Sequence, residues 1–202
     1  ADGSIEFRDV SFKYRAEAAE DVLEHIDLRI EGGSTVGILG GTGSGKSSLV
    51  QLIARLYDAT EGAVLVGGRD VRDYDLAALR DAVGIVLQKN VLFTGTVLEN
   101  LQWGNPQASD DELLAACRAA CVDEFLDRIG GLDGELGQGG AGVSGGQKQR
   151  LCIARTLLKH PRVLIFDDST SAVDMATDAK IREHIARISD TTVLIIAQRI
   201  AS

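Results

Sequence analysis

The feature that most constrains this 202-residue chain is a glycine-rich segment, GGTGSGKS, at residues 40–47. It fits the pattern G-x-x-x-x-G-K-[ST], in which backbone N–H groups turn inward around phosphate oxygens. In that pattern Lys46 reaches the β- and γ-phosphates of a nucleotide, and the hydroxyl of Ser47 faces Mg²⁺. An apolar run at 35–39 precedes the segment and a helical pattern follows it, which is the order that a phosphate loop requires. A glycine-rich turn that binds nothing is the alternative, and this context disfavours it.

A second element, suited to a metal, is the sequence VLIFDD at 163–168. An apolar strand of this kind delivers Asp167 to the edge of a sheet, where its carboxylate can hold Mg²⁺ through water, because hard cations prefer oxygen ligands. Alone, the pattern is common at the ends of strands. Together with the upstream glycine loop it predicts a site for a nucleotide and Mg²⁺.

The composition narrows the classes of protein. Hydrophobic residues make up 45% of the chain and charged residues 25%, as in an ordinary globular domain. No apolar run approaches the roughly 20 residues of a membrane span, and the first residues lack a secretory pattern, so we expect a soluble piece. The formal net charge of -9 argues against a broad contact with nucleic acid, and we expect no such partner.

Three cysteines, Cys117, Cys121 and Cys152, fit a reducing compartment better than a disulfide framework. On a helix Cys117 and Cys121 would share a face and could bind a metal, but no histidine accompanies them. Packing in the core is the interpretation that we favour.

Hydrophobic periodicity predicts the secondary structure. Residues 5–14 and 25–30 alternate apolar and polar side chains, which indicates a small antiparallel sheet. A helical region is expected over 109–129, where Ser109 and Glu112 form a capping box. Continuous apolar runs predict buried, mostly parallel strands at 35–39, 83–87, 163–166 and 193–196.

The sequence VSGGQ at 143–147, followed by KQR, resembles the signature that distinguishes ABC ATPases from other phosphate-loop proteins. The resemblance covers essentially the whole chain, and the motifs fall in the family's order. It implies an α/β fold: a P-loop NTPase (RecA-like) core with a mostly parallel sheet, an N-terminal antiparallel β subdomain and an inserted α-helical subdomain. Residues 1–202 would form a single ABC ATP-binding domain. Its approximate lobes are 1–88 with 160–202 for the core and antiparallel sheet, and 89–159 for the helical lobe with the signature helix.

The signature itself suits a second anion site. Ser144 would cap a helix and leave the N–H groups of Gly145 and Gly146 open to an anion, although a plain helix cap is the alternative. In the family, the signature of one subunit closes over the ATP of the other. This role falls here on Ser144, Gly145, Gly146 and Gln147.

Further site residues follow from the resemblance. Tyr14 matches the aromatic that stacks on adenine, Gln88 the glutamine of the loop joining the lobes, and Asp174 the segment SAVD that crosses to the partner. The implied ligands of Mg²⁺ are Ser47, Gln88 and Asp167. The residues expected to bind ATP are Tyr14, Gly40, Gly41, Thr42, Gly43, Ser44, Gly45, Lys46, Ser47, Ser48 and Gln88.

The stretches at 5–14 and 92–100 look like the exporter branch of the family, in which this domain follows membrane helices in one polypeptide. That resemblance implies a membrane domain N-terminal to the sequence and a position at the cytoplasmic face of the cell membrane. It also implies that the segment after Gln88 touches the coupling helices of the transmembrane domain.

Two positions depart from the family pattern, and both concern hydrolysis. After Asp167 the family places a glutamate that orients or deprotonates the attacking water, whereas this chain has the shorter Asp168. A displacement of about 1 Å in a catalytic group can cost on the order of 100-fold. Gln198 stands where the family has a histidine, and an amide cannot carry the charge or shuttle the proton of an imidazole.

The residues placed in catalysis are therefore Lys46, Asp168 and Gln198, and we expect them to cleave ATP slowly. The intact signature would complete an active site on a partner's phosphate loop, so a heterodimer with a second ABC nucleotide-binding domain is favoured over a homodimer in which Asp168 suffices. A soluble ABC ATPase acting on ribosomes or DNA is disfavoured by the net charge of -9. A non-catalytic ATP-binding regulator is a further alternative.

Overall fold

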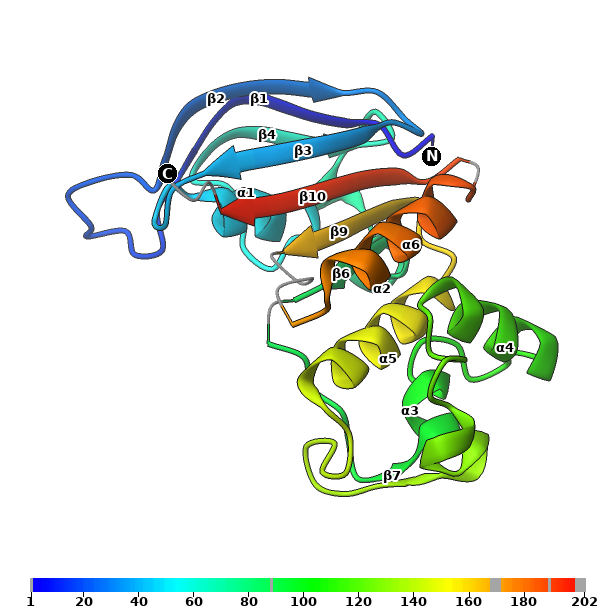
Figure 1. Ribbon diagram of the computed structural model, residues 1–202. Helices are drawn as coiled ribbons and strands as arrows, with labels where there is room; N and C mark the ends of the chain where they lie inside the picture. Colours follow the sequence, from blue (N-terminus) through cyan, green and yellow to red (C-terminus); the bar gives the residue numbers. More distant parts are fainter. Residues whose placement is uncertain (1, 88, 168–171, 189, 199–202) are drawn as a thin grey trace. The chain divides into compact units, whose positions relative to one another are not determined.

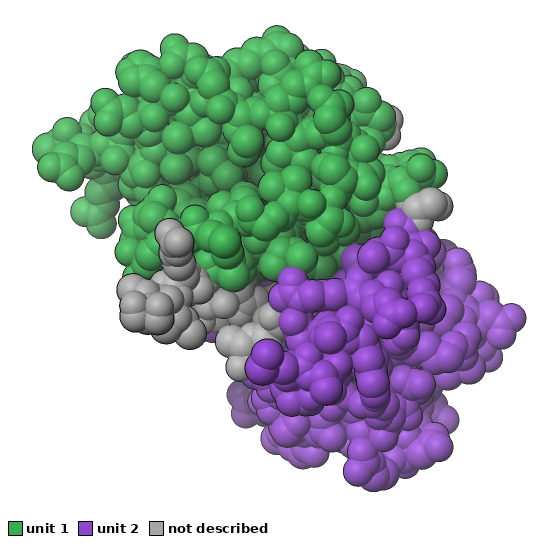
Figure 2. Space-filling model, turned by 45° about the horizontal axis from the view of Figure 1, so that its top comes forward, with its two compact units in different colours: residues 1–84, 161–167, 189–202 green, residues 85–160, 168–188 purple. Residues whose placement is uncertain are grey.

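The computed structural model describes residues 2–87, 89–167, 172–188 and 190–198, with Gln198 described by its backbone alone (Figure 1). The chain divides into two compact units, which are treated separately here. Unit 1 comprises 1–84, 161–167 and 189–202, and unit 2 comprises 85–160 and 168–188 (Figure 2). Compared with the lobes expected from the sequence, this division groups 168–188 with the helical unit.

Unit 1 contains an antiparallel sheet with the strand order β2-β1-β4-β5. Alternation along β1 buries Ile5 and Phe7, and a bulge between Phe7 and Val10 then brings Val10 into the core as well. The antiparallel sheet predicted from the sequence is confirmed, with two strands more than the alternation indicated. Its strands are β1 (Ile5–Phe12), β2 (Leu23–Ile30), β4 (Glu61–Val66) and β5 (Arg69–Asp70).

A second sheet has the strand order β3-β10-β9-β6, and Figure 1 shows β3, β10 and β9 running in the same direction. Asp167 at the end of β9 pairs with Ile196 of β10, and Gly40 at the end of β3 pairs with Gln198. The carboxyl ends of these strands therefore meet at one edge of the sheet, which is where α/β proteins bind ligands. The strands are β3 (Thr35–Gly40), β10 (Thr192–Gln198), β9 (Val163–Asp167) and β6 (Val83–Val86).

Burial differs between these strands. All five residues of β9 are buried, as its apolar run predicted. The expectation of a buried strand at 35–39 is wrong, because Thr35 and Gly37 are exposed and Leu39 is 68% exposed. Among the described strands β3 lies at the edge of its sheet, and its exposed residues alternate with partly buried ones, so one face of the strand is left uncovered.

The helices of unit 1 are α1 (Lys46–Ile53), α2 (Leu76–Ala82) and a 3₁₀ turn, η1 (Val71–Asp73). The helical pattern after the glycine loop is confirmed, and α1 ends at Ile53. Arg55 has a φ of +50°, and the Leu56 amide donates to the carbonyl of Gln51, which closes the helix end.

Unit 2 is mainly helical. The capping box expected at Ser109 and the cap expected at Ser144 are both present. The Ser144 cap is itself a capping box, with Gln147, and Thr96 forms a third with Glu99. Its helices are α3 (Val97–Gln102), α4 (Asp110–Ala119), α5 (Gly145–Leu157) and α6 (Met175–Ala186), with 3₁₀ turns η2 (Asp127–Ile129) and η3 (Gly131–Asp133). A short two-stranded antiparallel sheet pairs β7 (Gly95–Thr96) with β8 (Glu135–Leu136), which are far apart in the sequence.

The helix predicted over 109–129 is shorter than expected. It stops at Ala119 because Cys121 adopts a left-handed conformation with a φ of +55°. The amide of Val122 then donates to the carbonyl of Cys117, and that of Cys121 to Arg118, which is a Schellman helix end. Cys121 therefore lies beyond the helix that carries Cys117, and both thiols are buried and free, in keeping with a packing role.

Crossing a bilayer demands a long apolar helix, and the described ranges contain none of that length and apolarity.

Candidate functional site

The glycine loop leaves the end of β3 and enters α1, as the motif requires. Gly43 and Gly45 have φ values of +78° and +81°, a conformation that disfavours other residues. A side chain at Gly45 would also collide with its surroundings, because a Cβ there would lie 2.8 Å from Leu23 Cδ2 and 2.9 Å from the carbonyl oxygen of Val22. The loop therefore depends on glycine at this position for both conformation and space.

Lys46 is held across this loop. Its ammonium donates to the carbonyl oxygens of Gly40 at 2.9 Å and Gly41 at 2.6 Å, and to Ser44 Oγ at 3.0 Å. An ammonium has three N–H donors, so the loop uses all of them. Charged phosphate oxygens are stronger acceptors than these neutral groups, which makes Lys46 suited to transfer its donors to a nucleotide.

The first turn of α1 adds donors to the same place. Its N-cap is Gly45, and no side chain caps the helix. The free N–H groups and the positive end of the helix dipole are the two elements of an anion site at a helix N-terminus. Thr42, Gly43 and Ser44 of the loop are exposed, so the approach to these donors is open to solvent.

A pair of oxygen-bearing side chains completes the phosphate side. Ser47 Oγ donates to Asp167 Oδ1 at 3.1 Å, which joins the start of α1 to the end of β9. Asp167 is only 9% exposed. A hydroxyl and a carboxylate at this separation fit Mg²⁺, because that cation takes oxygen ligands and keeps several waters.

Tyr14 follows β1 and lies against α1. Its hydroxyl is 2.7 Å from Ser48 Oγ and donates to Gln51 Oε1 at 3.2 Å. Tyr14 is 49% exposed, whereas Ser48 is 5% exposed. Two residues that the sequence analysis placed on ATP are thus joined to each other directly.

The signature helix has the expected N-terminus. Ser144 Oγ accepts from the amide of Gln147 at 3.2 Å, and Gln147 Oε1 accepts from the amide of Ser144 at 2.8 Å. Gly146 lies close to the segment that precedes α6, because a Cβ there would come within 2.8 Å of the Ala172 carbonyl oxygen. Ser144 and Gly145 are exposed, so the N-terminus of α5 is accessible.

Asp174, the last residue of the expected crossing segment, caps α6. Its carboxylate accepts from the amide of Thr177 at 3.0 Å and from the Thr177 hydroxyl at 2.8 Å. These bonds to Thr177 hold the pKa of Asp174 below its ordinary value of 3.8. Asp174 is exposed.

Three expected site residues fall at the gaps in the described ranges. Gln88 and Asp168 lie outside the described residues, as does the side chain of Gln198. The structure places only the backbone of Gln198, opposite Gly40 in the parallel sheet. The roles assigned to these residues stay predictions.

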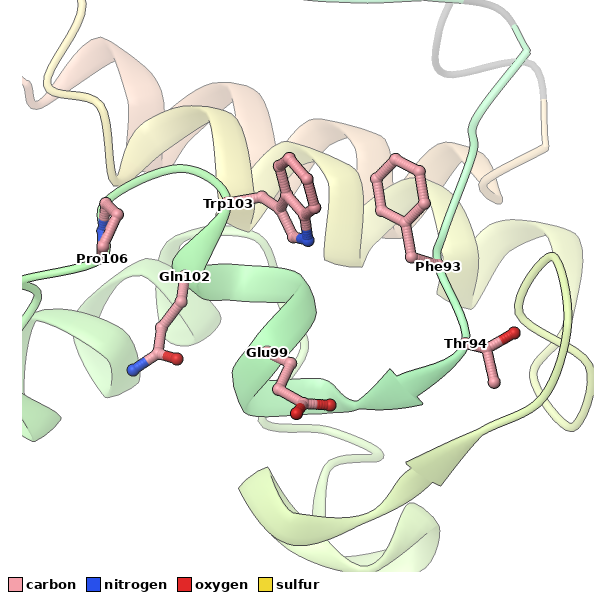
Figure 3. A pocket seen from close by; sticks show the side chains of 6 residues that line it. All are labelled: Phe93, Thr94, Glu99, Gln102, Trp103 and Pro106. Carbon is pink, nitrogen blue, oxygen red and sulfur yellow. The ribbon is translucent and has the colours of Figure 1, made fainter.

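One feature of unit 2 escaped the sequence analysis. A pocket of about 540 Å³ is lined by Phe93, Thr94, Glu99, Gln102, Trp103 and Pro106. The rings of Phe93 and Trp103 lie side by side in it, with centroids 5.0 Å apart (Figure 3). Arg155 of α5 stands over Phe93 at 5.9 Å and donates to the Val91 carbonyl at 3.0 Å. The sequence carried no signal for this pocket, because exposure of aromatic residues depends on tertiary packing.

A glycine loop with its lysine, a serine–aspartate pair and a helix entered from a parallel strand define a phosphate-loop nucleotide-binding domain. The sequence profile of the ABC transporter family matches residues 23–171. The chain belongs to that family.

Individual relatives agree with this assignment. The chain is 41% identical over 202 residues to YgaD of Bacillus subtilis, whose name assigns it to multidrug export as an ATP-binding/permease protein. It is 46% identical over 202 residues to the cyclolysin secretion/processing ATP-binding protein CyaB of Bordetella pertussis. These matches cover 99% of this chain but only 35% and 28% of the two relatives, so the chain spans about a third of their length.

Among solved structures, a bacterial Atm1-family ABC exporter with ATP bound superposes with a TM-score of 0.91. Sequence identity is 38%, and the match covers 96% of this chain and 34% of the exporter chain. The fold class expected from the sequence is confirmed: a P-loop ABC ATPase fold with an N-terminal antiparallel sheet, a parallel sheet and helices.

Proposed function

We propose that this chain binds Mg-ATP and pairs with a second nucleotide-binding domain to power export of a substrate across a membrane. The observation that carries the proposal is the placement of Lys46 and of the Ser47–Asp167 pair at one edge of the parallel sheet. Relatives named as exporter ATP-binding proteins support the coupling to transport.

In this proposal each residue has a distinct task. Tyr14 stacks on adenine, the loop N–H groups and Lys46 hold the β- and γ-phosphates, and Ser48 supports the loop from α1. Ser47 and Asp167, together with Gln88, hold Mg²⁺, which when bound would neutralise charge on the phosphate oxygens. The remaining members of the phosphate-binding set are Gly40, Gly41, Thr42, Gly43, Ser44 and Gly45.

The signature serves a second subunit. The accessible N-terminus of α5, with Ser144 as its cap, offers N–H groups to an anion that this chain does not itself supply. Gln147 holds the cap in place, and Asp174, in the proposed crossing segment, caps the helix that follows. ATP between two such domains would join them, and its hydrolysis would separate them.

Hydrolysis at the chain's own phosphate loop is proposed to be slow. Asp168 is a shorter base than glutamate, and Gln198 cannot act as a charged imidazole. A heterodimer then follows, in which the partner's loop carries out most of the hydrolysis and this chain contributes the signature.

The pocket at Phe93 and Trp103 is the proposed docking place for a coupling helix of the transmembrane domain. Trp103 is 66% exposed and Phe93 is 45% exposed, and exposed apolar side chains that lie together mark sites of contact with another protein. The relative YgaD is named as an ATP-binding/permease protein, so a membrane part shares its polypeptide. That arrangement would place this domain at the cytoplasmic face of the cell membrane.

The binding proposal is tested with Lys46→Ala in the full-length protein. We expect Mg-ATP affinity to fall by at least about tenfold, because hydrogen bonds between charged groups are lost. Lys159→Ala, a lysine substitution in unit 2, is the matched control and should leave affinity unchanged. Equal affinity in wild type and Lys46→Ala, by isothermal titration calorimetry, would refute nucleotide binding at this loop.

The slow-site proposal needs a separate experiment. Single-turnover hydrolysis is measured in a complex whose partner subunit has lost its catalytic glutamate. Rapid cleavage remaining at this chain's site would contradict the proposal and favour a homodimer in which Asp168 suffices. The double variant Asp168→Glu with Gln198→His should accelerate cleavage at this site if only chemistry limits it.

A further inference from the structure

The ring of Tyr14 is surrounded by two other aromatic rings of unit 1. Its centroid lies 4.8 Å from that of Phe12 and 5.1 Å from that of Tyr57, with interplanar angles of 77° and 86°. Phe12 and Tyr57 also contact each other, at 5.7 Å. Edge-to-face pairs at these distances are favourable beyond the burial of their surface.

The surroundings of the three rings differ. Phe12 is 2% exposed and belongs to the core, whereas Tyr14 and Tyr57 are 49% and 45% exposed. Tyr57 follows the closed end of α1, where the left-handed Arg55 turns the chain. The turn at the end of α1 therefore places the exposed side chain of Tyr57 beside Tyr14.

The hydroxyl of Tyr14 supplies a third point of attachment. It lies 2.7 Å from Ser48 Oγ and 3.2 Å from Gln51 Oε1, both on α1. Because α1 begins at the phosphate loop, this bond ties the orientation of the Tyr14 ring to the helix that holds the phosphates.

We propose that Tyr57 is a positioning residue for the base of the nucleotide, acting through Tyr14. It rests on the proposed function, in which Tyr14 stacks on adenine. The Tyr14 ring is already held on two sides and by its hydroxyl, so it loses less conformational entropy when a base stacks on it. The smaller entropy loss gives a higher affinity for the nucleotide. Tyr57 contributes to base binding without touching the nucleotide.

A double-mutant cycle tests this in the full-length protein, with Tyr14→Leu, Tyr57→Leu and the double variant. The probes are the Mg²⁺ complex of β,γ-imido ATP and, in competition with it, ribose 5-triphosphate, which lacks the base. We expect Tyr57→Leu to weaken imido-ATP binding by about threefold to tenfold, the range of an aromatic pair, and to leave ribose 5-triphosphate unchanged. In the Tyr14→Leu background the same substitution should change affinity by less than about twofold, because its target is already gone.

Two conservative variants keep the test independent of folding. Tyr57→Phe retains the ring and should bind imido-ATP within about twofold of wild type. Tyr14→Phe retains stacking but loses the bond to Ser48, so it should weaken imido-ATP by about twofold to tenfold and spare ribose 5-triphosphate.

Three results would overturn the inference. A full loss from Tyr57→Leu in the Tyr14→Leu background would show that Tyr57 contacts the base itself. If Tyr57→Leu lowers the affinity for both probes equally, the variant disturbs the phosphate loop. If it lowers the affinity for neither probe, Tyr57 does not contribute to binding of the base. If Lys46→Ala abolishes binding while Tyr57→Leu changes nothing, the proposed function stands and only this inference fails.

Discussion

The hydroxyl of Ser47 donates to the carboxylate of Asp167 at 3.1 Å, although the two residues are 120 positions apart in the sequence. The bond joins the helix after the phosphate loop to the end of the central strand β9. It brings a hydroxyl and a carboxylate, the oxygen groups that the proposed Mg²⁺ site requires, into one place.

Asp167→Asn should therefore weaken the Mg²⁺-dependent part of ATP affinity while preserving the shape of the side chain. We expect a loss of about tenfold to a hundredfold with Mg²⁺ present, because an interaction with a charged group is removed. Titration in excess EDTA is the control, and there wild type and variant should agree. Equal losses with and without Mg²⁺ would instead indicate damage to the loop.

Substitutions of Ser144 can distinguish its role as a helix cap from its proposed role in binding an anion. Ser144→Ala should lower the free energy of unfolding by about 1 kcal/mol, because the amide of Gln147 loses its acceptor. Ser144→Asp keeps a good cap and should unfold like wild type, but its carboxylate would repel a partner's γ-phosphate. Urea denaturation and ATP hydrolysis by the full-length complex are measured side by side. If Ser144→Asp hydrolyses ATP as fast as wild type, Ser144 acts only as a helix cap and does not bind the partner's γ-phosphate.

Gly145 and Gly146 are adjacent in α5 but differ in the space around them. A Cβ at Gly146 would lie 2.8 Å from the Ala172 carbonyl oxygen, whereas at Gly145 the nearest atom is Ala172 Cβ at 3.9 Å. Gly146→Ala should be less stable by about 1–3 kcal/mol through overpacking. Gly145→Ala should be unchanged or up to about 1 kcal/mol more stable, because alanine favours a helix. Equal unfolding midpoints for the two variants in urea would contradict this difference.

The cap of α6 predicts a dependence on pH. The bonds from Thr177 lower the folded-state pKa of Asp174, so its contribution to stability is present above the unfolded value of 3.8 and is lost as the pH falls through the folded value. Asp174→Asn keeps a capping side chain without this titration. The difference in unfolding free energy between the two proteins should therefore stay constant above about pH 4 and shrink as the pH falls further. Parallel pH curves throughout that range would show that the cap does not titrate.

The sequence analysis was correct where structure is decided by neighbours in the chain. The cap of α5 needs only Ser144 and Gln147, three residues apart, and the cap of α4 needs only Ser109 and Glu112. The end of α4 was missed because Cys121 is a non-glycine residue in a left-handed conformation, which sequence patterns do not anticipate. The exposure of Leu39 was missed because it depends on the position of β3 in its sheet.

By itself the sequence determined the phosphate loop, its glycines and lysine, the signature cap and membership of the α/β class, because each rests on short spacings or on the period of apolar side chains. The sequence analysis placed Ser47 and Asp167 at one Mg²⁺ site, but only the tertiary structure showed their direct hydrogen bond. It alone also decided that Tyr14 contacts Ser48 and Tyr57, and that Phe93 and Trp103 line a pocket. Contacts of this kind depend on the register of strands and on where distant turns end. Those features emerge when the core packs as a whole, and no local pattern encodes them.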